Sequence, residues 1–446
     1  MTNPIKRAAV IGAGISGVTA AAHLKKEGIE VTVFERSSAA GGICPCYIGL
    51  KNNVSTRLLE TTLNCFPAGT EDFVTHNYLS DYIQDTSIKN GVHEATRYNT
   101  NVKKVVKSKT LWSVDTETLH VNESGELQKS ATSEVFETVV VASGHYHAPR
   151  VPPTPGLAEW KRRWPDRVQH SKRYRSPEGA KGKNYLLVGG SVSSTDIARE
   201  LGPLANRIYQ SQRQGTFDLP ANLLPENGYR VDEVASYNSP ISSESYQLDI
   251  SEPIPATVTL KSGEKLCDIH HVILCTGYHL TLPFLSHLHA DSTPASQAND
   301  EVLVTDGTQF HNLHKDIFYI PDPSLVFIGV PFYTATFTLF EFQAMVVAKV
   351  LSGQAKLPSE EEMHEEYWEK MKASGHGKAF HSLKDKEKEY VDELLEWVNE
   401  DLKRAGRSAL SGHSEKWQRA KEEQVVRLKA MFGGSNSVRG FEVTCQ

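Results

Sequence analysis

The chain has 446 residues, of which 39% are hydrophobic and 23% are charged, and its formal net charge is −6 at pH 7. A chain of this length and composition can bury the cores of two or three ordinary domains, so disorder is not the expected state. The mild acidity and the scattered basic residues argue against a nucleic-acid partner. No window offers the roughly 20 apolar residues that a membrane-spanning helix needs.

The cysteines and the N-terminal segment bear on the compartment. Six cysteines are too sparse for a disulfide framework, which suggests a reducing environment. Residues 1–17 run into an apolar strand without the charged and then apolar pattern of a signal peptide. We therefore expect a soluble intracellular protein, located in the cytoplasm. Cys44 and Cys46 lack C-x-x-C spacing and further ligands nearby, so we expect ordinary side chains there and no metal site.

The pattern at the start of the chain predicts a strand, a turn, a helix and a second strand. An apolar run at 7–11 leads into Gly-rich sequence, then into a helical apolar pattern at 16–28, and then into the strand-like segment 29–35. The same order returns at 183–202, followed by 207–213. The chain thus carries two βαβ openings of the nucleotide-binding type, and one cofactor rarely needs two.

The segments between and after these openings predict further elements. Residues 101–117 and 137–144 are expected to be strands of a sheet that returns to the first site. The Pro-rich stretch 147–156 is expected to mark a crossing between domains. The remaining expectations are a hairpin at 258–266, buried strands at 270–278 and 324–330, an amphipathic helix at 337–353, and charged helices at 360–372 and 384–405.

The first turn fits a dinucleotide site. Gly12, Gly14 and Gly17 supply G-x-G-x-x-G, in which missing side chains let backbone amides and a helix N-terminus approach a pyrophosphate. Glu35 ends the second strand, where a carboxylate can hold ribose hydroxyls. The neighbouring Arg36 leaves the choice between ribose and phosphate open, while the further pair Gly41 and Gly42 favours FAD.

The second turn is altered. Gly189 holds the first turn position, but Ser191 and Ser194 stand where the motif has its second and third glycines. Serine is small and can donate its hydroxyl to a phosphate, so the site can survive. Ser211 and Arg213, in place of an acid at the end of the second strand, suit a 2′-phosphate and favour NADPH over NADH.

The segment RWPDRVQHSKRY resembles the F-x-G-x-x-x-H-x-x-x-(Y/W) signature of the flavin-containing monooxygenases, with Trp164, Asp166, His170 and Tyr174 on the marked positions. Trp164 and Asp166 depart from the aromatic and the glycine of that pattern. The resemblance covers most of the chain. It also includes Y-I-G-L-K-N-N, the T-G-Y of Thr276, Gly277 and Tyr278, and a closing segment that contains Gln343.

The resemblance implies an α/β fold with two Rossmann-like dinucleotide-binding domains, in the compact form found in lower eukaryotes and bacteria. The NADPH domain (176–275) would be inserted into an FAD domain made of residues 1–175 and 276–446. Thr276, Gly277 and Gln343 would join the glycines in cofactor binding. Asn53 would be the catalytic asparagine near the reactive edge of the flavin, with Asn52 as the competing assignment.

The implied reaction uses FAD, NADPH and molecular oxygen. A flavin hydroperoxide would transfer one oxygen atom to a soft nitrogen or sulfur nucleophile of a small molecule, which needs no general base of the protein. Tyr174-Arg175-Ser176 resembles the enzymes that oxygenate nitrogen and sulfur, which ranks Baeyer-Villiger ketone oxygenation second. An NADPH oxidase that releases hydrogen peroxide, and a flavin-binding protein that no longer uses NADPH, stay open. So does a homodimer, because no short motif marks an interface.

Overall fold

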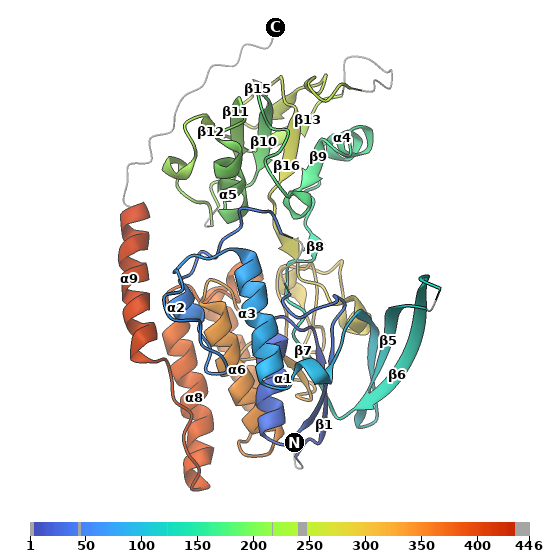
Figure 1. Cartoon of the computed structure of the whole chain (residues 1–446), viewed down its shortest axis with the longest axis vertical. Helices are drawn as coiled ribbons and strands as arrows, with labels where there is room; N and C mark the ends of the chain where they lie inside the picture. The colour runs from blue at the N-terminus through green and yellow to red at the C-terminus, as the bar shows by residue number, and fades with distance from the viewer. Residues whose placement is uncertain (1–3, 43–45, 123, 216, 240–247, 433–446) are drawn as a thin grey trace. The chain divides into compact units, whose positions relative to one another are not determined.

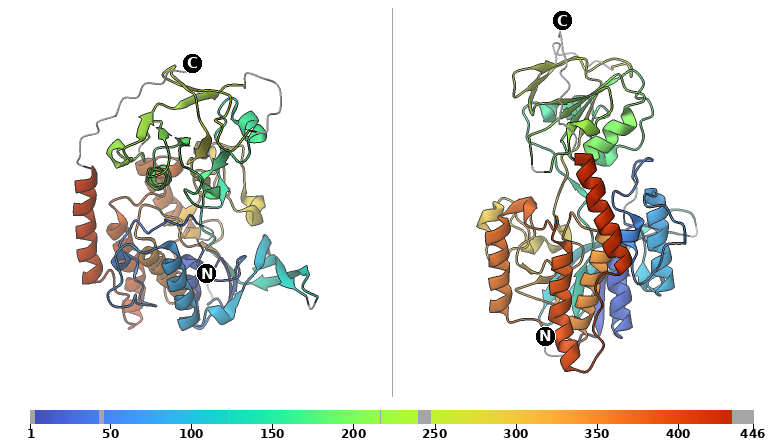
Figure 2. Two further views of the ribbon diagram at one scale, coloured as in Figure 1. Left: turned by 45° about the horizontal axis from the view of Figure 1, so that its top comes forward. Right: turned by 90° about the vertical axis from the view of Figure 1, so that its left-hand side faces the viewer.

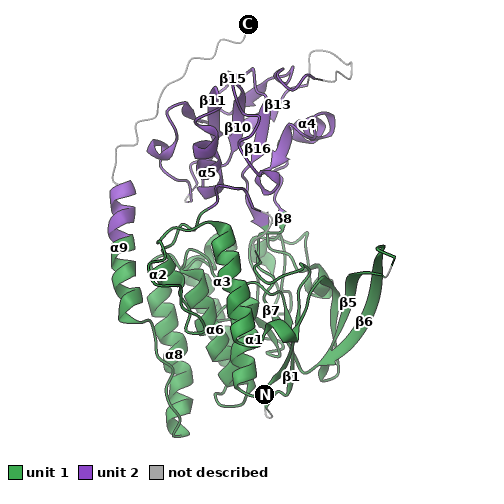
Figure 3. Cartoon of the chain, in the orientation of Figure 1, with its two compact units in different colours: residues 1–44, 51–148, 279–424 green, residues 45–50, 149–278, 425–446 purple. Residues whose placement is uncertain are grey.

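The computed structural model describes residues 4–42, 46–122, 124–215, 217–239 and 248–432, so Cys44 lies outside the described residues. The chain divides into two compact units (Figure 3). Unit 1 contains residues 1–44, 51–148 and 279–424, and unit 2 contains residues 45–50, 149–278 and 425–446. The main divisions fall inside the Pro-rich stretch and directly after Tyr278. Among the described residues, none of the helices combines the length and the apolar character needed to cross a bilayer.

Unit 1 is built on a seven-stranded sheet in the order β18-β19-β20-β7-β1-β2-β3, and its core β20-β7-β1-β2-β3 is parallel (Figure 1). The bounds of these strands are β1 Arg7–Ile11, β2 Glu30–Phe34, β3 Thr96–Arg97, β7 Thr138–Val141, β18 Leu313–His314, β19 Phe318–Tyr319 and β20 Leu325–Phe327. The helices are α1 Ile15–Lys26, α2 Thr56–Leu59, α3 His76–Lys89, α6 Thr336–Leu351, α7 Glu360–Ser374 and α8 Glu387–Arg404, with α9 Glu415–Phe432 divided between the units after Gln424. Short 3-10 helices lie at η1 His93–Ala95, η4 Pro283–Leu288, η5 Ala295–Gln297 and η6 Gly377–Ala379.

The alternation of strand side chains gives the sheet two covered faces. Ala8 and Val10 of β1 pack into the core that contains α1, α3, α6 and α8. Ala9 and Ile11 point the other way, into a core shared with Trp112 of a separate antiparallel sheet. This second sheet has the order β4-β5-β6, with bounds β4 Thr100–Ser108, β5 Leu111–Val121 and β6 Leu127–Phe136. The central strands are therefore buried on both sides, as a parallel sheet requires.

Most of the predicted elements are confirmed, with one difference. Residues 137–144 contain β7, which pairs with β1 as expected. Residues 101–117 do not join that sheet, because they fold into β4 and β5 and cover its face instead. The pattern shows that these strands alternate, but it does not show which sheet they join.

Unit 2 is built on a parallel sheet in the order β12-β11-β10-β16-β9. The bounds are β9 Val168–His170, β10 Asn184–Val188, β11 Arg207–Ser211, β12 Gly228–Val231 and β16 His271–Leu274. The expected hairpin lies within a smaller sheet of β13 Val234–Tyr237, β14 Val258–Leu260 and β15 Lys265–Leu266. The helices are α4 Leu157–Arg163 and α5 Val192–Leu201, with η2 Ser171–Arg173 and η3 Ala221–Leu223, and the short strands β8 Ala148–Pro149 and β17 Tyr278–His279 lie where the chain changes unit. Each unit thus has the strand-turn-helix-strand opening that the sequence predicts.

Candidate cofactor and active site

The turn between β1 and α1 requires glycine at its first and last motif positions. Gly12 has φ +105°, and a Cβ built there would lie 2.6 Å from the carbonyl oxygen of Ala142, at the end of the neighbouring β7. A Cβ at Gly17 would lie 1.8 Å from the carbonyl oxygen of Gly12. The backbone of the helix therefore packs directly on the turn, which brings the N-terminus of α1 to the carboxyl end of the sheet.

Gly14 has a different environment. It is the N-cap residue of α1 with φ −72°, and a Cβ there would meet only the Cα of Gly42, at 3.6 Å. The Gly41-Gly42 turn packs against the turn between β1 and α1, since the N–H of Gly41 donates to the carbonyl of Ala13 at 3.0 Å. The first turn of α1 also receives no side-chain cap. Its N–H groups are thus available to an anion such as a pyrophosphate.

The carboxylate of Glu35 is fixed beside this turn. It is 6% exposed and accepts the N–H of Ala13 on Oε2 and the N–H of Ser37 on Oε1, each at 2.7 Å. A carboxylate has about four acceptor positions, so two remain for ribose hydroxyls. This donor and acceptor set fits the adenosine end of a dinucleotide.

Gln343 supports the first nucleotide turn from α6. It is fully buried on α6, where its Oε1 accepts the N–H of Gly329 at 3.0 Å and its Nε2 donates to the Tyr390 hydroxyl at 2.7 Å. Gly329 has φ +93°, and a Cβ there would lie 2.5 Å from the Oγ of Ser16 in α1. Gln343 therefore holds the chain that follows β20 against the start of α1.

The second turn repeats the construction of the first. Gly189 has φ +126°, and a Cβ there would lie 2.4 Å from the carbonyl oxygen of Cys275, at the end of the neighbouring β16. Ser191 is the N-cap of α5. Ser194 is fully buried, where its hydroxyl donates to the Ser191 carbonyl and accepts from Nε2 of Gln210, both at 2.8 Å. Gln210 thus satisfies the extra hydroxyl at the third glycine position, and no motif marks Gln210 in the sequence.

Ser211 and Arg213, at and just after the end of β11, differ in burial. Ser211 is buried, and its hydroxyl donates to the carbonyl of Asp232 at 2.9 Å. Arg213 is exposed, so its guanidinium is the one that an incoming phosphate can reach. Asp218 comes close to the turn as well, because a Cβ at Gly190 would lie 2.6 Å from its Oδ1. The sequence gives no signal for Asp218, since it lies in an irregular loop.

His170 and the T-G-Y segment meet at the carboxyl end of β16. The Nδ1 of His170 accepts the N–H of Lys172 at 3.1 Å, which leaves Nε2 to donate to the Gly277 carbonyl at 3.0 Å. The Thr276 hydroxyl donates to the carbonyl of Arg150. Burial also lowers the pKa of His170, so the ring is neutral and fastens β9 to this turn. Asp166 has no positive φ, so the position where the signature has glycine does not need one here.

Asn52 and Asn53 have opposite environments in unit 1. The amide of Asn52 accepts the N–H of Val74 at 2.6 Å and donates to the carbonyls of Val54 and Asp72 at 2.6 and 2.7 Å. Asn53 is exposed, and its side chain makes no hydrogen bond with any described residue. Asn52 therefore holds the loop together, whereas the amide of Asn53 bonds to no described residue.

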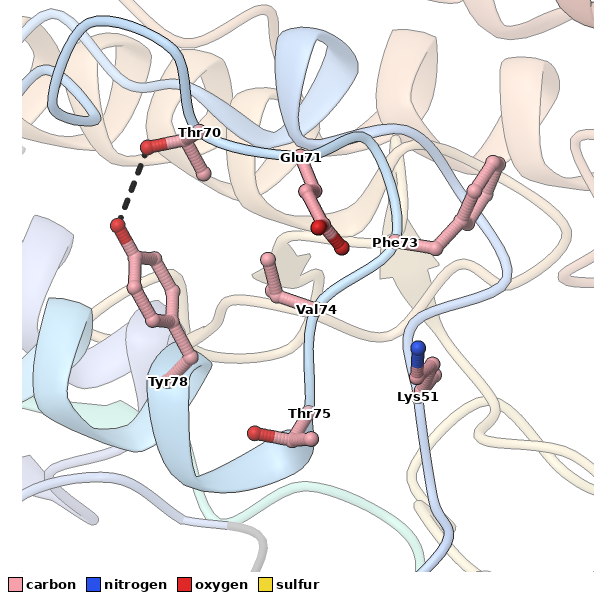
Figure 4. Close-up of a pocket in the computed structure, with 7 residues that line it drawn as sticks. All are labelled: Lys51, Thr70, Glu71, Phe73, Val74, Thr75 and Tyr78. Carbon is pink, nitrogen blue, oxygen red and sulfur yellow. Dashed lines mark hydrogen bonds between the residues drawn. The ribbon is translucent and has the colours of Figure 1, made fainter.

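A pocket of about 280 Å³ opens beside this loop (Figure 4). It is lined by one lysine, one glutamate, two aromatic side chains, two threonines and a valine, namely Lys51, Glu71, Phe73, Tyr78, Thr70, Thr75 and Val74. The figure shows Tyr78 reaching up to Thr70, and the two hydroxyls lie 3.1 Å apart. The pocket shares its wall with the asparagine loop, since Lys51 bridges to Thr75.

Ion pairs fasten the same loop to α2 and α9. Arg57 donates from Nε and one terminal nitrogen to the two carboxylate oxygens of Asp72, both at 2.9 Å, and that nitrogen also contacts Glu423 at 2.6 Å. Ser55 adds a hydroxyl bond to Asp72 at 2.5 Å. Asp72 accepts from Asn52 through its carbonyl, so these contacts bear on the loop that carries Asn53. The sequence does not reveal them, because the partners lie far apart along the chain.

A buried acid lies elsewhere in unit 1. Asp316 is fully buried, where it accepts from Nδ1 of His381 at 2.9 Å and from Lys370 at 2.6 Å. Although burial opposes it, the attraction of Lys370 and His381 holds the pKa of Asp316 below its ordinary value. This cluster joins α7 to the β18-β19 hairpin and supports the fold.

Two kinds of comparison identify the family. The model of the flavin-binding monooxygenase-like family matches residues 5–239 and 245–403. The chain belongs to this family. The enzyme is 44% identical to the flavin-containing monooxygenase ustF2 of Aspergillus flavus, with 96% of this chain and 99% of that protein covered. It is 43% identical to ustF1 of the same organism, with 94% and 89% covered.

The fold agrees with solved structures. The S-allyl-L-cysteine S-oxygenase from Allium sativum superposes with a TM-score of 0.72 at 24% identity, covering 97% of this chain and 94% of that one. The enzyme is a flavin-dependent monooxygenase with FAD and NADPH as its cofactors. The α/β fold with Rossmann-like domains expected from the sequence is confirmed.

Proposed function

We propose that the enzyme transfers one oxygen atom to a nucleophilic nitrogen or sulfur of a small molecule. The observation that supports this is the amide of Asn53, which bonds to no described residue and lies two positions along the chain from Lys51 in the pocket wall. A thioether or an amine attacks with its own lone pair, so the protein needs donors that orient the oxygen and not a base. The related S-allyl-L-cysteine S-oxygenase also supports a sulfur substrate.

The proposal assigns one cofactor to each unit. Unit 1 would bind FAD, with its pyrophosphate at Gly14 and the N-terminus of α1 and its ribose at Glu35. Unit 2 would bind NADPH, with its pyrophosphate at Ser191 and its 2′-phosphate at Arg213. When bound, the two cofactors supply the hydride and the activated oxygen. The chain itself would position the two cofactors. Four residues would do so by holding the turns through their contacts within the chain, namely Ser211, Thr276, Gly277 and Gln343.

The substrate would reach the loop of Asn53 through the pocket of Figure 4. Phe73 and Tyr78 offer apolar contact, while Lys51 and Glu71 place both signs of charge at the rim. Asn53 would donate its N–H to the oxygen that is transferred, and Asn52 would fix the backbone from which Asn53 projects. Two roles would thus fall on one loop, which binds the substrate and orients the transferred oxygen.

The experiment is rapid mixing of the reduced enzyme with oxygenated buffer under ¹⁸O₂, with a thioether, a tertiary amine or a cyclic ketone present. We expect NADPH to bleach the flavin and ¹⁸O to appear in a sulfoxide or an N-oxide. Incorporation into an ester from the ketone alone would replace the proposal by Baeyer-Villiger chemistry. Stoichiometric hydrogen peroxide with every substrate would indicate an oxidase, and absence of bleaching would show that the altered second turn does not use NADPH.

A further inference from the structure

A strained tyrosine lies in the segment that joins β20 to α6. Tyr333 has φ +60°, whereas the other non-glycine residues with positive φ in the described part of the chain are all Asn, Asp, Lys or Gln. A bulky residue in this left-handed region is an outlier, and such outliers gather at functional sites. The side chain of Tyr333 is 42% exposed, so its burial offsets little of the strain.

Both neighbours of Tyr333 are fixed by the segment that leads into α8. On one side, the N–H of Phe332 donates to the carbonyl of His381 at 3.1 Å. On the other side, the buried carboxylate of Glu387 accepts the Thr334 hydroxyl at 2.6 Å and the N–H of the next residue at 2.8 Å. The turn is therefore held from both ends, which keeps the tyrosine at positive φ.

The segment also passes the first nucleotide turn. A Cβ at Gly329 would lie 2.5 Å from the Oγ of Ser16, at the start of α1, and α6 runs beside α1, as Figure 2 shows. β20, β7 and β1 are parallel neighbours, so the chain leaves all three at one edge of the sheet. Tyr333 follows Gly329 by four residues, a reach of at most about 14 Å. FAD with its pyrophosphate at this turn has its flavin ring one ribityl chain away, which is within that reach.

The end of the segment packs on the helix that follows the asparagine loop. Ala335 belongs to a buried cluster with Leu58 of α2, and Val54 packs against this cluster. Tyr333 comes two residues before Ala335, and Asn53 comes directly before Val54. The exposed tyrosine and the exposed asparagine therefore adjoin the same buried cluster of unit 1, although they lie far apart along the chain.

We propose that the ring of Tyr333 lies against the flavin ring of bound FAD and forms part of the surface at which oxygen is transferred. This rests on the proposed binding of FAD in unit 1. An aromatic side chain suits this place because it stacks on the flat flavin ring and also offers apolar contact to a substrate. The strain then has a purpose, because a turn that is fixed in advance presents the ring to the cofactor without rearrangement on binding.

The first test compares Tyr333→Gly with Lys109→Gly, by thermal unfolding of the flavin-free protein and by titration with FAD. Lys109 is the matched control for strain, because it also has positive φ and is exposed in the turn between β4 and β5. Glycine relieves the strain at either position, so both variants should raise the melting temperature by about 1–3 °C. Only Tyr333→Gly should weaken FAD, by about two- to tenfold, as for the loss of one aromatic contact.

Two results of this test would overturn the proposal. The first is an FAD affinity of Tyr333→Gly that equals that of the wild type or of Lys109→Gly, because the ring would then make no contact with the cofactor. The second is a lower melting temperature for flavin-free Tyr333→Gly, because the ring would then support the fold. Opposite changes in stability and in FAD affinity are expected only where strain serves binding.

The second test measures the flavin fluorescence of the holoenzyme with Tyr333→Phe. A tyrosine in contact with an excited flavin quenches it by a brief and reversible electron transfer, and phenylalanine has the same ring shape without this ability. We therefore expect unchanged FAD affinity and melting temperature, together with a higher fluorescence yield and a longer fluorescence lifetime. Unchanged fluorescence would show that Tyr333 does not touch the flavin ring.

The variant Glu35→Gln separates this proposal from the assignment of FAD to unit 1. We expect weaker FAD binding, because a neutral amide accepts fewer hydrogen bonds from the ribose. Wild-type FAD affinity would remove the cofactor assignment and the Tyr333 contact with it. Weaker affinity in Glu35→Gln, combined with unchanged fluorescence in Tyr333→Phe, would overturn the Tyr333 contact alone.

Discussion

Gly14 and Gly17 both belong to the first nucleotide motif, but the structure predicts different consequences for replacing them with alanine. At Gly17 the new methyl group would lie 1.8 Å from the Gly12 carbonyl oxygen, although contacts under 3.0 Å are essentially never seen. The start of α1 must therefore move by about 1.2 Å, and overpacking of this kind costs about 1–3 kcal/mol. At Gly14 the methyl group meets only a Cα at ordinary contact distance, which costs less than about 1 kcal/mol as a loss of cap preference.

The assay separates folding from cofactor binding. The thermal unfolding of flavin-free protein is followed by circular dichroism, and FAD affinity is measured by quenching of flavin fluorescence. Gly17→Ala should lower the melting temperature by about 2–5 °C in the absence of FAD. Gly14→Ala should leave that temperature nearly unchanged and weaken FAD about tenfold, or 1.4 kcal/mol, because the methyl group keeps the pyrophosphate away from the amides. Equal destabilisation by the two variants, or unchanged FAD affinity of Gly14→Ala, would refute the reasoning.

Three further predictions concern the loop, the second cofactor and acid stability. Asn53→Ala should leave the free energy of unfolding unchanged and raise the amount of hydrogen peroxide released per NADPH consumed. Asn52→Ala should instead lower the free energy of unfolding by about 1–3 kcal/mol, because it leaves loop backbone groups without hydrogen bonds. If both variants released the same excess of hydrogen peroxide and lost the same stability, the two asparagines would not have these separate roles. Arg213→Ala should weaken NADPH by about 1.5–3 kcal/mol and leave NADH unchanged in steady-state kinetics; a parallel loss for both would place the phosphate elsewhere. Asp316→Asn should cost about 3 kcal/mol in denaturant unfolding at pH 7. Because the pKa of Asp316 is lowered by folding, this difference should be complete above about pH 4 and shrink as the pH falls further; a difference that grows in acid would contradict the ion pair with Lys370.

The sequence predicts most of the fold because its strands and helices have clear periods. The apolar run at 7–11 is the buried strand β1, the run at 270–278 contains the buried strand β16, and the segment 337–353 covers all but the first residue of α6. The position of β4 and β5 could not be predicted in the same way. An alternating pattern identifies a half-buried strand, but the sheet that it joins depends on tertiary contacts, here those around Trp112.

For the candidate site, the sequence locates the turns and not the groups that support them. Gly12 and Glu35 follow strands at the motif spacing, so their place at the sheet edge can be anticipated. Gln210 beneath Ser194 and the pair Arg57 and Asp72 belong to no motif. Their roles come from contacts between segments distant in the chain, which a single sequence does not encode in any short pattern.

The two nucleotide turns differ in how freely they can change. At Gly12 and Gly189 the obstacle to a side chain is the backbone carbonyl oxygen of Ala142 and of Cys275. Every amino acid has this oxygen, so replacing Ala142 or Cys275 would not make room for a side chain at either glycine. At Ser194, in contrast, a glutamine side chain accommodates the hydroxyl, so that position can exchange together with a partner. Libraries that aim to alter the cofactor preference should leave the first turn positions untouched and vary residues 194 and 210 as a pair.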